Sequence, residues 1–285
     1  MAQINIKQLF AQKYDQIKIL LLKDGIKEVS LLENKENKQK IIMKEIDISK
    51  LNEKEKEMSE QEGKILLKLK HPNIINCYGF YYEKDKIIIL IEYAEGGDLF
   101  NKIENQKNKN KYFKEEEIID WFIEICEGIK YIHSNNIIHR DLKPQNIFFN
   151  KDNHIKIGDF SFSKQLINTN KAITRLGSEN YISPEIISNQ SYDYRIDIWN
   201  LGIILYELTQ LKHPFEDNKI SIEKKINNIL KGEFFNFSNK NYSPKLLNLI
   251  EDLLKVNPNE RKNIDEILLI CYTIKITKNS NSKNE

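Results

Sequence analysis

The chain of 285 residues has only three cysteines, Cys77, Cys126 and Cys271, and none of them belongs to a CxxC pair. Three widely spaced thiols of odd number suit a reducing compartment, so we expect neither a disulfide framework nor a zinc cage. Arginine is also rare, with four residues, whereas lysine, asparagine and isoleucine are plentiful. AT-rich coding can produce this bias without a functional cause, so the composition assigns no activity.

The chain also lacks an excess of charge of one sign and a long apolar run. Its 44 basic and 42 acidic residues leave a net charge of +2, which argues against a nucleic-acid groove or an acidic-membrane footprint. No apolar run approaches the roughly 18 residues of a spanning helix, and the first residues lack the basic flank and apolar block of a signal peptide. We therefore expect a cytoplasmic protein without nucleic-acid or membrane partners.

Apolar and aromatic residues, by contrast, are abundant, at 40% and 10% of the chain. Disordered chains have far fewer of both. At this length about 75% of the unfolded surface can be buried on folding, so a core needs no disulfide or structural metal. One large domain or two lobes fit the length.

The first ninety residues alternate short apolar runs with charged turns, a pattern that predicts strands at Gln16–Leu22, Glu28–Leu32, Gln39–Ile46 and Ile87–Ile91. The charged stretch Leu51–Lys70 has apolar residues at helical spacing, which predicts one helix within a mostly antiparallel sheet. The paired glycines of Glu95–Asp98 then predict a bend.

Helical patterns follow the bend. Apolar residues recur every three or four positions before His139 and predict a long helix, and the segment Asp197–Thr209 is apolar nearly all round, as in a helix at the centre of a lobe. Ser243–Pro244 and Asn263 mark the starts of two late helices. We expect an N-terminal extension at 1–13, a folded domain at 14–272 and a polar, disordered tail at 273–285.

Two motifs carry chemistry: the segment from His139 reads HRDLKPQN, and GDF follows twelve residues after its asparagine. With this pattern the chain resembles a eukaryotic protein kinase catalytic domain. The resemblance implies an α+β, bilobal fold, with a small antiparallel N-lobe at 14–91, a hinge at 92–97 and a mainly helical C-lobe at 98–272. It also implies that Asp141 orients the substrate hydroxyl and that Lys143 steadies the transferred phosphate of ATP.

The same resemblance assigns ligands for the metal and the nucleotide. Asn146 and Asp159 would ligate Mg²⁺, which prefers hard oxygen donors. Lys44 stands in the place of the family's VAIK lysine, and Glu62 on the predicted helix would pair with it, since burying an unpaired lysine is costly.

The resemblance implies further residues around the nucleotide: Val29, Ile42 and Phe148 about the adenine, the hinge residues Glu92 and Ala94, and Asp98 near the ribose or a basic substrate residue. For Asp98 a solvated loop position is nearly as good an interpretation.

Packing and regulatory roles also follow from the resemblance. A hydrophobic column between the lobes would consist of Leu66, Cys77, His139 and Phe160. Glu185 would pair with Arg261, and Asp197 would brace the catalytic loop.

Thr174, four residues before Ser178, has the spacing of an activation-loop phosphorylation site, with Arg140 and Lys164 as receivers of the phosphate. An exposed loop threonine is the alternative.

Lys143 and Ser178 are of the serine/threonine type, and further segments resemble the NIMA-related (NEK) kinases over about residues 14–270. These segments are KEID at Lys44, LKHPNII at Leu69, IEYAEGGDL at Ile91 and LYELTQLKHPFE at Leu205. The resemblance implies ATP and Mg²⁺ as cofactors and serine or threonine residues of proteins as substrates. No coiled coil is present in the sequence, so we expect a monomer.

The chain departs from the family at the glycine-rich loop, where Leu22, Asp24 and Lys27 occupy the glycine positions. Glycines let backbone amides approach phosphates, so we expect weaker nucleotide binding. Ser161 replaces the glycine of DFG, which is tolerable if its φ stays negative. The leading hypothesis is an active serine/threonine kinase, and the alternative is a pseudokinase that serves as a scaffold. A small-molecule kinase lacks support, because residues 174–185 resemble a protein-substrate platform.

Overall fold

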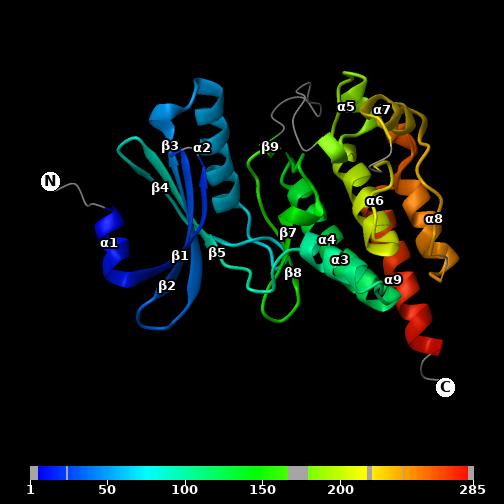
Figure 1. Cartoon of the computed structure of the whole chain (residues 1–285), viewed down its shortest axis with the longest axis horizontal. Coiled ribbons are helices and arrows are strands. Elements are labelled where there is room, and N and C mark those ends of the chain that lie inside the picture. Colours follow the sequence, from blue (N-terminus) through cyan, green and yellow to red (C-terminus); the bar gives the residue numbers. More distant parts are fainter. Residues whose placement is uncertain (1–5, 24, 166–178, 217–219, 240, 282–285) are drawn as a thin grey trace. The chain divides into compact units, whose positions relative to one another are not determined.

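The computed structural model describes residues 6–23, 25–165, 179–216, 220–239 and 241–281. The chain divides into two units, residues 1–95 and 96–285. Figure 1 shows a sheet in the first unit and mostly helices in the second. The protein is therefore of the α+β class expected from the sequence.

The first unit is built on a five-stranded antiparallel sheet with the strand order β1-β2-β3-β5-β4. Its strands are β1 (Tyr14–Lys23), β2 (Lys27–Asn34), β3 (Lys40–Asp47), β4 (Cys77–Glu83) and β5 (Lys86–Glu92). Four of them lie where apolar runs predicted strands. The central position of β3 matters for the site, because both of its neighbours fix its register.

No apolar run in the sequence predicts β4. Its seven residues, CYGFYYE, are aromatic rather than aliphatic, and only Cys77 and Gly79 are buried. β4 is an edge strand, so it needs no continuous apolar run, although its tyrosines and phenylalanine are typical of strands. The aromatic residues of this segment were therefore the feature of the sequence that could have predicted a strand.

Helices cover the sheet. α1 (Ile6–Lys13) precedes β1, within the stretch expected to be an extension, and its Phe10 packs against a buried cluster that includes Leu32 and Ile88. α2 (Glu53–Lys68) packs against β4 and β5 and begins at a capping box between Asn52 and Glu55. Because both faces are covered, Ile87, Ile88 and Ile89 of β5 are all fully buried, which accounts for the unbroken apolar run there.

The second unit has α6 (Arg195–Gln210) at its centre, and fourteen of the sixteen residues of this helix are buried. The other helices, shown in Figure 1, are α3 (Leu99–Asn108), α4 (Glu115–Ser134), α5 (Pro184–Ile187), α7 (Ile222–Lys231), α8 (Pro244–Leu253) and α9 (Ile264–Asn281). The predicted long helix before His139 is α4, and the two predicted late helices are α8 and α9.

Short antiparallel pairs position the functional loop. β6 (Ile137–Ile138) pairs with β9 (Lys164–Gln165), and β7 (Ile147–Phe149) pairs with β8 (Ile155–Ile157). The loop from His139 to Asn146 joins the first pair to the second and ends in the 3₁₀ turn η2 (Pro144–Asn146). Both ends of this loop are therefore anchored by β-pairing.

The prediction of a disordered tail from residue 273 is wrong for the described residues, because α9 continues to Asn281. α9 packs along α4, where Ile274 is 2% exposed and Cys271 is fully buried. Lys275 pairs with Asp120 of α4 at 2.7 Å, and Lys278 pairs with Glu116 at 2.9 Å. The polar composition concealed a helix whose stability comes from tertiary contacts.

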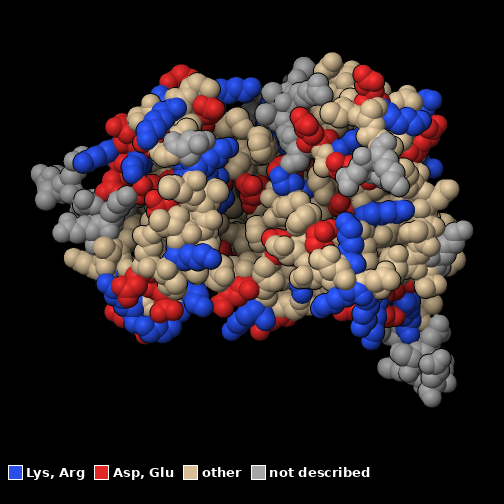
Figure 2. Space-filling view, in the orientation of Figure 1, with Lys and Arg blue, Asp and Glu red and all other residues tan. Residues whose placement is uncertain are grey.

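Charged side chains of both signs intermingle on the face shown in Figure 2. This mixing agrees with the balanced composition. None of the helices in the described ranges combines the length and the apolar character needed to cross a membrane.

Candidate active site

The segment His139–Asn146 places a carboxylate between a cation and an amide. Asp141 is 2% exposed, and it accepts hydrogen bonds from Lys143 Nζ at 2.8 Å and Asn146 Nδ2 at 3.0 Å. Asn146 Nδ2 also donates to the Asp141 carbonyl at 2.7 Å. The three side chains singled out by the HRDLKPQN motif are thus brought together.

Asp197 at the start of α6 fixes the backbone of this loop. Its two carboxylate oxygens accept hydrogen bonds from the backbone amides of His139 and Arg140, each at 3.0 Å. His133 of α4 contributes a third contact at 2.8 Å. Burial acts to raise the pKa of Asp197, but these hydrogen bonds and the histidines hold the pKa below its usual range. Asp197 therefore remains a carboxylate, and it offsets the strain of the positive φ of Arg140, 67°.

Asp159 lies in a turn that is joined to the catalytic loop. The amide of Gly158 donates to the Asn146 carbonyl at 2.9 Å, and Asp159 has a φ of 56°. Ser161 is not among the described residues with positive φ, so serine replaces glycine without backbone strain. Its hydroxyl donates to Asp159 Oδ1 at 2.7 Å and thereby holds the carboxylate in one orientation.

The donor set on this turn fits Mg²⁺. Asn146 uses its amide nitrogen on Asp141, which leaves the amide oxygen as the group to present to a cation. Asp159 supplies a carboxylate from the adjoining turn. An amide oxygen and a carboxylate are the hard ligands that Mg²⁺ takes in phosphate sites, where water and phosphate oxygens complete its shell.

The first unit contains the predicted ion pair between strand β3 and helix α2. Lys44 Nζ lies 2.9 Å from Glu62 Oε1, and the side chains are 11% and 2% exposed. Backbone pairing with Val29 of β2 and Ile89 of β5 fixes the position of Lys44. The pair holds an ammonium group at a set place on the sheet, where an unpaired lysine would be expensive to bury.

The residues expected around adenine lie on several strands. Val29 lies on β2 and Ile42 on β3. Glu92, at the end of β5, forms two hydrogen bonds with the backbone of Asn76: its amide donates to the Asn76 carbonyl at 2.8 Å, and its carboxylate accepts from the Asn76 amide at 3.1 Å. Ala94 follows Glu92 and is partly buried. In the second unit, Phe148 is partly buried on β7. Their shared role at one nucleotide stays a prediction.

Asp98 is the N-cap of α3. Its carboxylate accepts from the backbone amide of Asn101 at 2.7 Å and from Asn101 Nδ2 at 2.8 Å. A capping role accounts for an aspartate at this position. Its predicted contact with ribose or a basic residue stays a prediction.

The four residues of the predicted column occur as two pairs. In the first unit, Leu66 and Cys77 are 1% and 2% exposed. In the second, the rings of His139 and Phe160 lie 4.9 Å apart, and both side chains are fully buried. The column that would join the two pairs stays a prediction.

The predicted phosphorylation residues Thr174 and Ser178 lie outside the described residues. Of the two predicted receivers, Lys164 lies on β9 opposite Ile138. Arg140 is 8% exposed, and its guanidinium donates to the carbonyl of Phe162 and to the Tyr192 hydroxyl. Arg140 is thus already engaged, and its role as a phosphate receiver stays a prediction.

Glu185 and Arg261 form the predicted pair. Two guanidinium nitrogens of Arg261 donate to the two carboxylate oxygens of Glu185 at 2.7 and 2.8 Å. The Arg261 side chain is 0% exposed and the Glu185 side chain is 3% exposed. This pair ties α5 to the loop before α9.

The altered glycine-rich loop is a closed hairpin. Backbone pairing of β1 with β2 continues to Lys23 and Lys27, and Ile26 N donates to Lys23 O at 2.8 Å. Gly25 has a φ of 64°, so its glycine is required by the turn. Lys50 Nζ donates to its carbonyl at 2.9 Å. Leu22 on this hairpin is 65% exposed.

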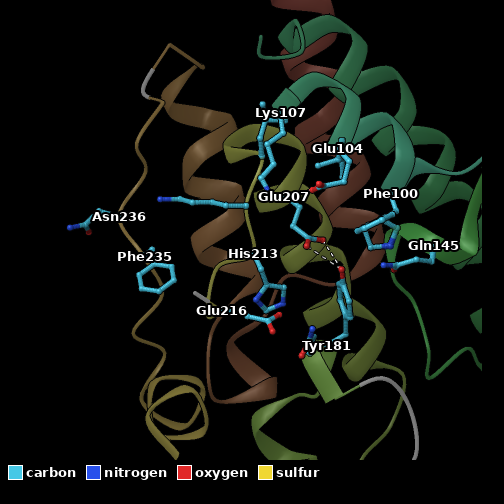
Figure 3. A pocket seen from close by; sticks show the side chains of 15 residues that line it. Phe100, Glu104, Lys107, Gln145, Tyr181, Glu207, His213, Glu216, Phe235 and Asn236 are labelled. Carbon is cyan, nitrogen blue, oxygen red and sulfur yellow. Dashed lines mark hydrogen bonds and ion pairs between the residues drawn. The ribbon is translucent and has the colours of Figure 1, made fainter. Parts of the chain in front are cut away.

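Sequence reasoning missed three residues that the structure places at or near the catalytic loop. His133 supports Asp197, and Tyr192 contacts Arg140. Glu207 on α6 lines a cavity of about 540 Å³ next to η2 (Figure 3). The available signal for Glu207 was a carboxylate in the apolar second half of α6. No sequence signal marks the other two, because their contacts join residues more than fifty positions apart.

Comparisons with known proteins agree with this geometry. The protein kinase domain family matches residues 25–272. Among curated proteins, the chain is 39% identical to serine/threonine-protein kinase Nek1 of Mus musculus, over 84% of the chain and 20% of that protein. It is 38% identical to serine/threonine-protein kinase Nek5 of Homo sapiens, over 90% of the chain and 36% of that protein.

A third relative comes from Dictyostelium discoideum. The probable serine/threonine-protein kinase nek3 of that organism is 40% identical over 91% of the chain and 23% of its own length. The chain thus spans between 20% and 36% of the length of these relatives. The family match covers most of the chain and includes every described residue of both motifs, so the chain belongs to the protein kinase domain family.

Proposed function

We propose that the chain is a serine/threonine protein kinase of NIMA-related type, which transfers the γ-phosphate of ATP to serine or threonine hydroxyls of proteins. The observation that carries the proposal is the arrangement of Asp141 with Lys143 and Asn146. The similarity to three kinases with serine/threonine in their names supports the choice of acceptor.

In this proposal Asp141 accepts a hydrogen bond from the substrate hydroxyl and takes its proton as the oxygen bonds to phosphorus. The bond from phosphorus to the bridging oxygen of ATP breaks at the same time, and ADP leaves. Lys143, already 2.8 Å from Asp141, offsets the negative charge of the transferring group. Positioning and electrostatics of this kind supply most of the rate enhancement in phosphoryl transfer.

Asn146 and Asp159 would hold Mg²⁺, and Lys44 would bind phosphate oxygens of ATP. Mg²⁺ supplies charge neutralisation on the phosphates when it is bound. The Ser161 hydroxyl presets the Asp159 carboxylate, and Glu62 presets Lys44. We expect this preorganisation to maintain turnover despite the replaced glycines of the β1–β2 hairpin.

The scaffold alternative receives no support from the comparisons. We further propose a cytoplasmic location and a monomeric state, for which the sparse cysteines and the missing coiled coil are the support. Gel filtration with light scattering tests the second of these proposals.

The direct test of activity is radiolabelled phosphate transfer from Mg-ATP to a generic protein substrate by the purified chain. Asp141→Asn should abolish transfer while preserving shape, and Asp152→Asn, an exposed aspartate of the β7–β8 turn, serves as the matched control with activity unchanged. Equal background counts in wild type and Asp141→Asn would refute the kinase proposal.

A further inference from the structure

The tip of the β1–β2 hairpin stands where related kinases have glycines, and Lys27 occupies the third of those positions. Glycines let backbone amides approach a phosphate closely, whereas a lysine brings a positive charge at the end of a flexible stem. The face of the sheet on which Lys27 lies decides whether this charge is near the proposed phosphate site. The register of the strands identifies that face.

The two faces of the sheet have different neighbours. One face carries a buried cluster that includes Leu32 and Ile88 and packs against Phe10 of α1. The opposite face carries Lys44, whose ammonium group reaches Glu62 of α2 at 2.9 Å. A side chain on this second face therefore shares the surroundings of the lysine that would bind phosphate oxygens of ATP.

The register places Lys27 on the same face as Lys44. Val29 lies directly opposite Lys44, and Lys27 is two residues from Val29, so the three side chains share one face. Lys27 lies directly opposite Ile46, which makes Lys44 its diagonal neighbour at a distance of about 7–8 Å. A triphosphate bound at Lys44 is therefore within reach of the Lys27 side chain.

A third lysine belongs to the same face. Lys23 of β1 lies directly opposite Lys27, so Lys23, Lys27 and Lys44 follow one another across three strands; we call these three residues the lysine row. Among the residues that the structure describes, neither Lys23 nor Lys27 has an acidic partner at ion-pair distance. Like charges directly opposite each other in a sheet are unfavourable, and an anion bound beside them removes that cost.

The acidic residues near the tip do not neutralise the lysine row. Glu28 follows Lys27 in β2 and therefore lies on the opposite face of the sheet, where its carboxylate accepts a hydrogen bond from the Ser30 hydroxyl at 2.8 Å. Glu62 counters one charge of the row, and Asp24 lies outside the described residues. The described part of the hairpin thus leaves the row with a net positive charge.

The tip is also held in place, so its lysines are positioned before a ligand binds. The Asp47 amide donates to the Ile26 carbonyl at 2.8 Å, which extends the β2–β3 ladder to the turn. Lys50, the last residue of the 3₁₀ turn η1 (Ile48–Lys50), donates to the Gly25 carbonyl at 2.9 Å. The same ammonium group lies 3.4 Å from the Asp47 carboxylate. A site that is ordered in advance loses less free energy to ordering when it binds.

We propose that Lys27, together with Lys23, binds phosphate oxygens of ATP in place of the backbone amides that glycines would provide. The inference rests on the proposed kinase function and names residues of this chain that make its nucleotide site selective for a triphosphate. An ammonium group acts on phosphate as a point charge, so the contact depends on the charge of the ligand and not on the adenine.

The test measures binding of Mg-ATP and of adenosine to the full chain by titration calorimetry. Adenosine has no phosphate, so the ratio of the two dissociation constants isolates what the phosphates contribute. Lys27→Gln should weaken Mg-ATP binding about three- to tenfold, the size of effect expected for one partly exposed charge pair, and should leave adenosine binding within about twofold. Lys54→Gln, an exposed change on α2, is the matched control and should alter neither constant.

Lys27→Arg distinguishes a charge contact from a merely structural role. The guanidinium keeps the charge, so this variant should retain Mg-ATP affinity to within about twofold of the wild type. The Michaelis constant for ATP should rise in Lys27→Gln by the same factor as the dissociation constant, with kcat nearly unchanged, because the contact exists equally in the bound and transition states. A structural role would weaken adenosine binding as well and would not depend on the charge at residue 27.

Equal Mg-ATP affinity in wild type and Lys27→Gln would overturn the inference, as would equal losses for Mg-ATP and adenosine or a wild type that binds no Mg-ATP. Thermal unfolding verifies that the variants fold. If Lys27→Gln does not fold, Lys23→Gln takes its place, because Lys23 is exposed. That variant should lose about two- to threefold in Mg-ATP affinity and nothing in adenosine affinity, and an unchanged Mg-ATP affinity would overturn the inference in the same way.

Failure of the proposed function gives a different result. A chain whose Mg-ATP affinity depends on Lys27 but which transfers no phosphate to a protein would refute the kinase proposal and leave the phosphate contact standing. A chain that transfers phosphate with the same Michaelis constant for ATP in wild type and Lys27→Gln would refute the phosphate contact alone.

Discussion

Arg261 binds both carboxylate oxygens of Glu185 in a fully buried pair. Removing one partner of such a pair leaves an uncompensated charge in the core, whereas an exposed pair contributes little. At the scale of single residues, the burial of a charge thus decides how much its partner matters.

We therefore expect Arg261→Met to lower the free energy of unfolding by about 3–5 kcal/mol. Arg195→Met is the matched control, because Arg195 pairs with Asp193 at 3.2 Å while remaining 35% exposed, and it should cost less than about 1 kcal/mol. Denaturant unfolding measures both. Similar losses in the two variants would contradict the argument from burial.

The three cysteines provide a second test at this scale. Burial raises the pKa of Cys77 and Cys126, and raises that of Cys271 to about 12. Only thiolates are alkylated efficiently, so iodoacetamide at about pH 8 should leave all three unmodified in the native chain and label them after unfolding. Mass spectrometry reads the result, and rapid labelling of the folded chain would show that a thiol is accessible.

Among the elements, α9 shows most clearly where sequence reasoning fell short. Its last three turns contain mostly polar residues, and their contacts with Asp120 and Glu116 of α4 arise only in the folded chain. β4 was missed because an edge strand does not need apolar residues on both faces. By contrast, β5 and α6 were predicted correctly, since both are buried all round and their apolar runs are unbroken.

A pair of isoleucines on α9 tests the role of its packing. Ile274 is 2% exposed and Ile276 is 66% exposed, so Ile274→Ala should destabilise the chain by about 2–4 kcal/mol. Ile276→Ala should change stability by less than about 0.5 kcal/mol. Thermal unfolding compares the two variants. Equal effects would mean that α9 contributes nothing to the core.

For the molecule as a whole, the kinase motifs identified the residues that the catalytic loop brings together, because their order along the chain is specific to the family. The resemblance also predicted that Asp197 braces this loop, but it did not predict the side chains that contact Asp197 and Arg140. The contacts of Asp197 with His133 and of Arg140 with Tyr192 depend on helix packing, which short motifs do not encode. The contact of Glu207 with the Tyr181 hydroxyl likewise became apparent only from the packing of α6.

The pH dependence of global stability reports on this carboxyl group. The pKa of Glu207 is about 8 in the folded chain and 4.5 in the reference state, so the native state binds more protons and stability falls as pH rises between these values. His213 acts in the opposite direction below about pH 6.5, because its folded pKa is about 3. In the window from about pH 6.5 to 8, Glu207 acts together with His154, whose pKa is raised by its hydrogen bond with Glu124.

In that window, Glu207→Gln should remove a decline of up to about 1.4 kcal/mol per pH unit in the free energy of unfolding. Denaturant unfolding at four pH values measures the slope, with Glu251→Gln, an exposed change on α8, as the control that should keep the wild-type decline. Identical slopes in wild type and Glu207→Gln would place the ionisation elsewhere.

The hydrogen bond from the Ser161 hydroxyl to Asp159 has a consequence for drug-like molecules. Some compounds bind only when the Asp159 carboxylate has moved away from this position, and their binding must break the hydrogen bond from Ser161. A glycine at residue 161 has no hydroxyl and cannot form this bond. Such compounds should therefore bind this chain less tightly than a Ser161→Gly variant, whereas compounds that leave Asp159 in place should bind both proteins equally.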